Sequence, residues 1–340
     1  MARTLVVLFL GTVAFAALTI AIGLVHFARD VLVLLGDAIP QLAGASSWHV
    51  PSYLAFNGIW FQFAVYYFFL VVPLGVLLLL LVDYLLKDRE TRWKIPPQIP
   101  VHGQPIAVVL TAYNDEASIG HAVDEFRSIP DVRHVIVVDN NCRDRTAEVA
   151  REHGAIVITE SQQGYGFACI AGLRHALTQT DDPLVVLSEG DMTFFGNDVQ
   201  KLVPYLADCD MVVGTRTTRS LTRPGSQMDW FMIWGNIFLA VLIRLRYWDW
   251  DFLGRVQLTD VGCTFRAIRR DSLARIIDRL TVGTYHFSPH MILVALQDGM
   301  NLTEAPVKFR PRMGESKGAG GSRTRAIQIG LAMLGSIMVH

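Results

Sequence analysis

Short runs of β-branched and other apolar residues alternate with helix-like stretches from residue 106 onward, and this alternation constrains the fold most strongly. Continuous apolar runs of about 4–8 residues are typical of strands that are buried on both faces of a parallel sheet. We therefore expect an α/β domain with a mainly parallel sheet and helices on both of its faces. The pattern predicts strands at residues 106–110, 135–138, 155–159, 184–187 and 211–214, and helices at 117–127, 145–153, 165–177 and 199–206.

Two longer apolar runs precede this domain, at about residues 4–28 and 57–86. Residues 4–26 contain no Asp, Glu, Lys or Arg. A helix rises about 1.5 Å per residue, so a run of this length can cross a hydrocarbon core about 30 Å thick. Basic residues gather at 87–94, directly after the second run, and the positive-inside rule places such a cluster in the cytoplasm. We expect residues 1–94 to form a membrane anchor of two transmembrane helices.

Composition suggests the remaining boundaries. Three prolines indicate a linker at residues 95–104, and the rest of the pattern indicates a domain at 105–325 on the cytoplasmic side of the cell membrane. Residues 228–247 are apolar and aromatic, which favours an interfacial helix at the bilayer, although a buried core helix also fits. The apolar segment 326–340 is short for a span. A net charge of −1 gives no sign of a nucleic-acid partner, and a homo-oligomer is compatible with the sequence.

Polar residues follow three of the predicted strands, at the point where ligands of such sheets bind. Thr111–Asp115 follows the first strand, Asp139 the second, and Glu189-Gly190-Asp191 the fourth. Some of these carboxylates could simply cap the following helices. Glu189 and Asp191 are two residues apart, so an extended segment can present both to one side, and the glycine between them allows a close approach to a ligand. Carboxylate oxygens suit Mg²⁺ or Mn²⁺ carrying a diphosphate.

Seven short segments occur in a characteristic order: 111–115 (TAYND), 138–146 (VDNNCRDRT), 163–166 (QGYG), 189–191 (EGD), 214–216 (GTR), 260–266 (DVGCTFR) and 312–317 (RMGESK). In this order, over residues 105–317, the chain resembles family 2 glycosyltransferases of the GT-A fold, a Rossmann-like α/β architecture. It resembles especially their dolichol-phosphate mannose synthase-like, polyprenyl-phosphate branch. The chain departs from the family pattern at Thr111, Asn140, Gln163 and Glu189, where the family has Pro, Asp, Lys and Asp. These departures bear on the base and sugar of the donor more than on the reaction class.

The resemblance implies a donor site for a UDP- or GDP-linked sugar and a divalent metal, Mg²⁺ or Mn²⁺, held by Asp191 with Glu189 assisting. Asp191 is thereby also a catalytic residue, because the metal withdraws charge from the leaving nucleoside diphosphate. The implied donor-binding residues are Thr111, Ala112, Tyr113, Asp115, Asp139, Gly164, Glu189, Gly190, Arg312, Ser316 and Lys317.

The acceptor implied by the resemblance is a polyprenyl phosphate, dolichyl or undecaprenyl, at the membrane. Arg216, Arg219 and Arg223 follow the fifth strand and could orient its phosphate. Asp260 is the candidate catalytic base if the acceptor is a hydroxyl. The family expectation is a single displacement with inversion. Two alternatives stay open: transfer to a lipid or polysaccharide hydroxyl, and a non-catalytic scaffold that binds nucleotide sugars.

Overall fold

The structure is a computed structural model, and it describes residues 75, 99–247, 256–313 and 323–339. Apart from residue 75, the two predicted transmembrane spans lie outside these ranges, and so do residues 95–98 of the predicted linker. None of the helices that the structure describes is both long and apolar enough to cross a membrane. The sheet and the helices considered below, as far as Met338, belong to one compact unit, Asp88–Met338.

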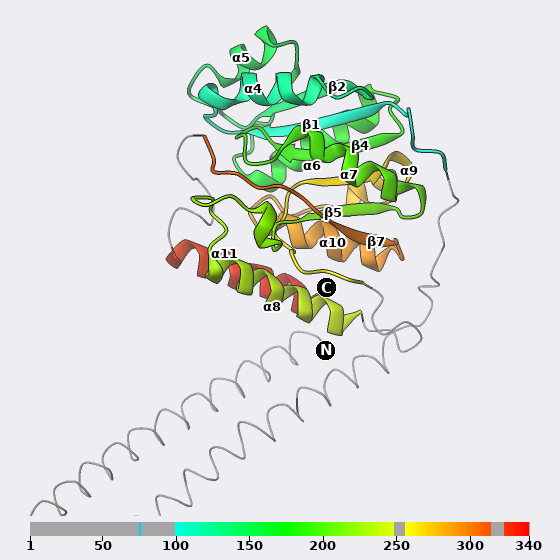
Figure 1. The fold of residues 1–340 in the computed structure, drawn as a ribbon, viewed down its shortest axis with the longest axis vertical. Coiled ribbons are helices and arrows are strands. Elements are labelled where there is room, and N and C mark those ends of the chain that lie inside the picture. Colours follow the sequence, from blue (N-terminus) through cyan, green and yellow to red (C-terminus); the bar gives the residue numbers. More distant parts are fainter. Residues whose placement is uncertain (1–74, 76–98, 248–255, 314–322, 340) are drawn as a thin grey trace, which may run out of the picture. The chain divides into compact units, whose positions relative to one another are not determined.

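A seven-stranded sheet in the order β3-β2-β1-β4-β6-β5-β7 forms the centre of this unit (Figure 1). All pairs are parallel except those that β6 makes with β4 and β5, which are antiparallel. The α/β fold with a mainly parallel sheet is thus confirmed. The strands are β1 Ile106–Ala112, β2 Val132–Asp139, β3 Ile156–Thr159, β4 Leu184–Glu189, β5 Met211–Thr215, β6 Arg266–Arg269 and β7 Leu302–Pro306.

The central strand β1 explains where a ligand can bind. All seven of its residues are buried, as expected of a strand covered on both faces. The chain proceeds from β1 to β2 on one side and later returns to β4 on the other, so the strand order reverses at β1. Register places Thr111 opposite Glu189 of β4, and Ala112 opposite Asp139 of β2. The polar strand ends therefore meet at one edge, at the topological switch point.

Helices cover the sheet as the sequence pattern predicts. α6 (Tyr165–Gln179) packs against β1, β2 and β4, and α4 (Glu116–Arg127) packs against β2. Gly172 lets α6 approach closely, since a Cβ there would lie 2.3 Å from Val109 Cγ1. The predicted helix at 199–206 is interrupted: α7 (Val199–Leu202) passes into a 3-10 turn, Val203–Ala207, that contains a proline. Further helices on the domain are α5 (Thr146–Glu152), α9 (Arg270–Ile276) and α10 (Phe287–Gln297).

Strands β6 and β7 were not predicted. β6 reads Arg-Ala-Ile-Arg, yet all four residues are buried. Its arginines satisfy backbone carbonyl groups: Arg266 Nη1 donates to Ser288 O at 3.1 Å, and Arg269 Nε donates to Leu206 O at 2.7 Å. A strand that buries two arginines in this way has no apolar signature, so its place in the sheet depends on tertiary partners.

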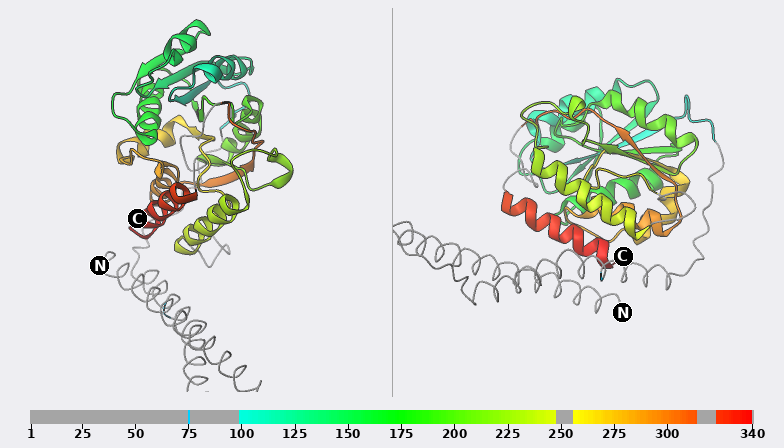
Figure 2. Two further views of the ribbon diagram at one scale, coloured as in Figure 1. Left: turned by 90° about the vertical axis from the view of Figure 1, so that its left-hand side faces the viewer. Right: turned by 60° about the horizontal axis from the view of Figure 1, so that its bottom comes forward.

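Two helices lie side by side at one edge of the unit: α8 (Trp230–Arg246) and α11 (Arg323–Val339) (Figures 1 and 2). α8 begins at Asp229, whose Oδ1 accepts a hydrogen bond from Met232 N at 2.9 Å. A helix is thus confirmed at the predicted position 228–247, and the C-terminal segment is helical as well. Both helices expose large apolar side chains, namely Trp230, Trp234, Phe238, Val241 and Leu245 on α8, and Ile327 and Leu331 on α11.

Candidate active site

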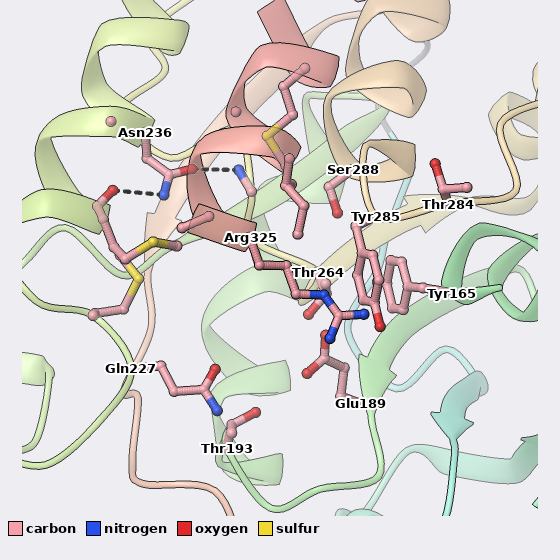
Figure 3. Close-up of a pocket in the computed structure, with 18 of the residues that line it drawn as sticks. Tyr165, Glu189, Thr193, Gln227, Asn236, Thr264, Thr284, Tyr285, Ser288 and Arg325 are labelled. Atoms are coloured by element: carbon pink, nitrogen blue, oxygen red, sulfur yellow. Dashed lines mark hydrogen bonds between the residues drawn. The ribbon is translucent and has the colours of Figure 1, made fainter. Parts of the chain in front are cut away.

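A cavity of about 730 Å³ lies at the carboxyl ends of β1 and β4, and α8 and α11 line its other walls (Figure 3). This is the position at which open α/β sheets bind ligands. The cavity brings together residues from distant parts of the chain. Among its lining are nine that the sequence predicts as site residues: Thr111, Ala112, Tyr113, Asp115, Gly164, Glu189, Asp191, Arg216 and Arg312.

Asp191 is buried just beyond β4, and its neighbours in the chain hold its carboxylate in place. Oδ1 accepts hydrogen bonds from Thr193 N at 3.0 Å and from Thr193 Oγ1 at 2.6 Å. Met192, between them, has φ of 65°, in the left-handed region that non-glycine residues rarely adopt. Such a conformation costs about 1–3 kcal/mol and persists where surrounding contacts enforce it, often at functional sites. The turn leaves the second oxygen, Oδ2, for another partner.

Arg312 contacts Asp191 Oδ2 and connects the segments that follow β1 and β4. Its Nη1 lies 3.1 Å from Asp191 Oδ2, and its Nη2 donates to Asp115 Oδ1 at 2.6 Å. The guanidinium is largely buried, with 13% of the side chain exposed. Burial works against its charge, but Asp191 and Asp115 raise the pKa of Arg312 above its usual value. A cation therefore already compensates the carboxylates of β1 and β4 within the protein.

Glu189 lines the same end of the cavity. Burial raises the pKa of its carboxyl to about 8, the Asp191 charge adds to this, and Arg312 and Arg216 oppose it. A divalent cation would relieve this repulsion. The described residues contain no cluster of three or more metal-ligating side chains. Mg²⁺ commonly uses only one or two carboxylates together with substrate phosphates and water, so Glu189 and Asp191 fit a metal that arrives with a diphosphate.

Asn140 organises the next part of the cavity wall, a role the sequence did not reveal. Its Oδ1 accepts hydrogen bonds from Gly164 N at 2.8 Å and from Gln163 Nε2 at 3.1 Å, while its Nδ2 donates to Gln162 O at 2.7 Å. A Cβ at Gly164 would lie 2.3 Å from Gly283 O. Asn140 and Gln163, two departures from the family pattern, thus bond to each other and shape one turn.

Arg216 is held rigidly by Asp260. Asp260 Oδ2 accepts from Arg216 Nε at 2.7 Å, and Oδ1 accepts from Nη2 at 2.9 Å, a bidentate pair. Burial opposes the charge on Arg216, but the carboxylate overcomes this effect and raises its pKa. Glu304 Oε1 in turn accepts from the backbone nitrogens of Thr259 and Asp260, at 2.8 and 2.7 Å. Asp260 is fully buried and does not line the cavity, whereas Arg216 does.

Asn236 links α8 to this network. Its Oδ1 accepts from Gly262 N at 2.9 Å, and its Nδ2 donates to Met232 O at 2.9 Å (Figure 3). A Cβ at Gly262 would lie 2.7 Å from Asn236 Oδ1 and 3.3 Å from Arg216 Nη2. The polar residue that interrupts the apolar pattern of α8 is therefore a tether between the helix and the Asp260 turn.

Arg325, in the first turn of α11, is a cavity residue that the motifs did not predict. Its guanidinium lies over the ring of Tyr285, 5.6 Å from the centroid. Tyr285 stacks in turn on Tyr165, with centroids 6.2 Å apart and planes within 1°. Figure 3 shows Arg325 extending from its helix toward the region between Thr264 and Glu189. Basic charge at the start of an apolar segment was the available sequence signal.

Other predicted residues lie elsewhere. Asp139 and Gly190 support the strand ends without lining the cavity: Asp139 Oδ1 accepts from Cys142 N at 2.9 Å, and Gly190 N donates to Thr111 O at 3.0 Å. Arg219 and Arg223 are exposed and also outside the lining. Ser316 and Lys317 fall outside the described residues, so their predicted contact with the donor stays a prediction.

The family model for glycosyl transferase family 2 matches residues 107–277. The chain therefore belongs to glycosyl transferase family 2, as its motifs predicted. It is 32% identical over 213 residues to a dolichyl-phosphate hexose transferase of Haloferax volcanii, covering 62% of this chain and 86% of that protein. It is 31% identical over 233 residues to an uncharacterized glycosyltransferase of Mycobacterium tuberculosis, covering 67% and 95%. The first similarity supports the polyprenyl-phosphate branch.

Solved structures support the fold. Glucosyl-3-phosphoglycerate synthase of Mycobacterium tuberculosis, in complex with Mn²⁺, UDP-glucose and phosphoglyceric acid, superposes with a TM-score of 0.52. The sequences are 18% identical, and the match covers 70% of this chain and 79% of that one. At this level of identity the similarity identifies a shared GT-A fold, and the assignment of ligands must come from the residues of this chain.

Proposed function

We propose that the protein is a membrane-bound, metal-dependent glycosyltransferase that transfers a hexose from a UDP- or GDP-linked sugar to a polyprenyl phosphate. One observation carries the proposal. The same cavity is lined by the acidic strand ends of β1 and β4 and by the apolar residues of two helices. Such a cavity suits a charged donor at one end and a lipid-linked acceptor at the other.

The donor end of the cavity comprises Tyr113, Asp115, Asp191, Glu189 and Arg312. Asp191 and Glu189 would hold Mg²⁺ or Mn²⁺, which neutralises charge on the leaving nucleoside diphosphate when it is bound. Asp191 is suited to this because Thr193 fixes one of its oxygens. Arg312 would then turn from Asp191 to the diphosphate, for which guanidinium geometry is well matched.

The acceptor end depends on Arg216. A phosphate monoester is already anionic at pH 7, so its oxygen can attack the sugar without a strong general base. We assign Asp260 a positioning role, because both of its oxygens hold Arg216 and it does not reach the cavity. A single displacement with inversion follows if the phosphate oxygen attacks directly, with no covalent sugar intermediate.

The domain division predicted from the sequence completes the proposal. Residues 1–94 would anchor the protein in the cell membrane through two transmembrane helices, with residues 105–325 on the cytoplasmic side. The exposed apolar face of α8 would rest in the membrane interface, since aromatic side chains such as Trp230 and Trp234 are favourable there. A lipid acceptor could then enter between α8 and α11 without leaving the bilayer.

The test uses the full-length enzyme in lipid nanodiscs with Mn²⁺, a polyprenyl phosphate, and a panel of UDP- and GDP-sugars. The lipid product is followed by mass spectrometry. We expect a product one hexose heavier from one donor, and loss of this product by at least about a hundredfold in Asp191→Asn. Donor turnover with a hydroxyl acceptor, but none with polyprenyl phosphate, would support the alternative acceptor class. Donor binding with no turnover on either would support the scaffold.

A further inference from the structure

We infer that Arg325 on α11 is a second cation for the acceptor phosphate, and that together with Arg216 it determines selection for a phosphorylated lipid. The inference rests on the proposed function and adds a residue to its acceptor site. It begins from the charges of the cavity. Among the described residues that line it, three are basic: Arg216, Arg312 and Arg325.

These three arginines differ in their contacts within the protein. Arg312 is bound to Asp115 and Asp191, at the donor end. Arg216 gives Nε and Nη2 to Asp260, which leaves Nη1 as its remaining group toward a ligand. A phosphate monoester carries about −1.5 to −2 charges at pH 7. A single guanidinium with two of its nitrogens already engaged matches this charge poorly, so a further cation is expected at the same end of the cavity.

The geometry of Arg325 suits that task. Tyr285 lies against one face of the guanidinium, and the N–H groups of a guanidinium point outward in its plane, the direction from which phosphate oxygens bind. In Figure 3 the side chain extends toward Glu189, and hence toward the end of the cavity at which transfer would occur. Tyr285 is itself stacked on Tyr165, so the ring beneath Arg325 has a partner of its own.

A buried hydroxyl group independently indicates a polar ligand there. Thr264 Oγ1 is buried, the residue lines the cavity, and this hydroxyl has no hydrogen-bond partner in the described part of the protein. An unsatisfied buried hydroxyl costs about 1–3 kcal/mol, so such groups are usually bound by something. An anionic head group between Arg325 and Thr264 would supply an acceptor atom for this hydroxyl.

The cavity also accommodates the tail of such a ligand. Beyond Arg325, the lining residues of α11 are Ala326, Ile327, Ile329, Gly330, Leu331, Met333 and Leu334, all without charge. A helix rises about 1.5 Å per residue, so this surface extends roughly 14 Å from Arg325. Phe231 and Phe238 of α8 line the same cavity. A phosphate at Arg325 can therefore leave its hydrocarbon chain between the two helices.

The experiment compares Arg325→Gln and Arg325→Lys with the matched control Arg323→Gln, in full-length enzyme in nanodiscs. Arg323 precedes Arg325 by two residues on the same helix, is exposed, and does not line the cavity. Steady-state KM is measured separately for polyprenyl phosphate and for the sugar donor. Inhibition by unphosphorylated polyprenol is measured as well, since it reports the tail site without the head group.

We expect Arg325→Gln to raise the acceptor KM by about tenfold or more, as for the loss of a charge-assisted hydrogen bond. The donor KM and the inhibition constant of polyprenol should stay unchanged, Arg325→Lys should recover part of the effect, and Arg323→Gln should behave as wild type. An unchanged acceptor KM, an equal effect in Arg323→Gln, or a rise confined to the donor KM would each overturn the inference. If wild-type enzyme does not glycosylate polyprenyl phosphate at all, it is the proposed function that fails.

Discussion

Arg312 Nη1 lies 3.1 Å from Asp191 Oδ2, so a guanidinium from the C-terminal part of the domain contacts the carboxylate to which we assign the metal. The same guanidinium also bonds to Asp115 at 2.6 Å. An arginine in this position prevents the acidic strand ends from repelling one another before a substrate arrives. It also means that a divalent cation and Arg312 compete for one oxygen of Asp191.

This competition predicts that Arg312→Gln binds Mn²⁺ more tightly than wild type when no donor is present. Removing the cation leaves Asp191 and Asp115 uncompensated, and charge pairs of this kind are commonly worth about 1–3 kcal/mol, or about fivefold to a hundredfold in affinity. Isothermal titration calorimetry with Mn²⁺ alone measures the effect. The donor KM should increase in the same variant, because the diphosphate loses its guanidinium.

A suitable control for Arg312→Gln is Arg275→Gln, on α9. Arg275 also bridges two aspartates, with Nε 2.8 Å from Asp298 Oδ2 and Nη2 3.1 Å from Asp210 Oδ1, and it does not line the cavity. It should leave the affinity for Mn²⁺ unchanged. If Arg312→Gln weakens Mn²⁺ binding, the arginine supports the metal site and the competition between the two cations does not exist.

Asp260→Asn should act on Arg216 and not on proton transfer. Breaking a buried ion pair costs about 3–5 kcal/mol, and the asparagine keeps part of the hydrogen bonding, so we expect a loss of about 2–4 kcal/mol of unfolding free energy. The acceptor KM should rise more than the donor KM, with the pH profile of kcat unaltered. Loss of one limb of that profile, with kcat reduced by a factor of about 10² or more, would instead identify Asp260 as a general base.

The pKa of Glu189, raised to about 8, predicts a pH dependence of metal binding. A metal ligand must be ionised, so below this pKa a proton leaves Glu189 as the cation binds. Affinity for Mn²⁺ should thus increase from about pH 6 to about pH 8, by at most about tenfold per unit, and then level off. Glu189→Gln should bind more weakly and lose this slope. A slope that persists in Glu189→Gln would assign the proton to another group.

The same shift has a consequence for the metal-free protein. Because the folded-state pKa of Glu189 lies above the ordinary value of 4.5, the folded form binds its proton more tightly than the unfolded form does. The contribution to stability is complete below about pH 4.5 and is lost as pH rises through about 8. Relative to wild type, Glu189→Gln should gain thermal stability with increasing pH over this interval, as measured by differential scanning fluorimetry without metal.

The exposed face of α8 predicts a dependence on the bilayer. Trp230, Trp234 and Val241 lie on one face of the helix, outside the lining of the cavity, and are 67%, 65% and 39% exposed. Replacing all three by serine should raise the KM for a long-chain acceptor in nanodiscs by more than about tenfold, since each loses a burial worth about 1.5–3 kcal/mol. The KM for a short, water-soluble acceptor should be the same in this variant as in wild type. Tyr205→Ser, another exposed aromatic far from α8 in sequence, serves as the control.

Among the expectations from sequence, the five predicted strands were confirmed, although β3, at the edge of the sheet, is partly exposed. β1, β4 and β5 are buried along almost their whole length. Such burial requires continuous apolar runs, which are visible without a structure. β6 could not be found in this way: its Arg266 and Arg269 are buried only because carbonyl groups of Ser288 and Leu206 accept their hydrogen bonds. Those partners are distant in sequence, so no local sequence pattern predicts these contacts.

The same distinction applies to the candidate site: some of its features could be predicted from sequence, and others depend on the tertiary structure. Sequence by itself determined the α/β class and the acidic strand ends, because parallel register carries residues such as Asp115, Glu189 and Asp191 to one edge. Only the tertiary structure decided which charged residues line the cavity. Arg219 and Arg223 lie outside the lining, Asp260 pairs with Arg216, and Arg325 of α11 is part of the lining. The physical reason is that electrostatic interactions act through space over a few ångströms, whereas sequence motifs record separation along the chain.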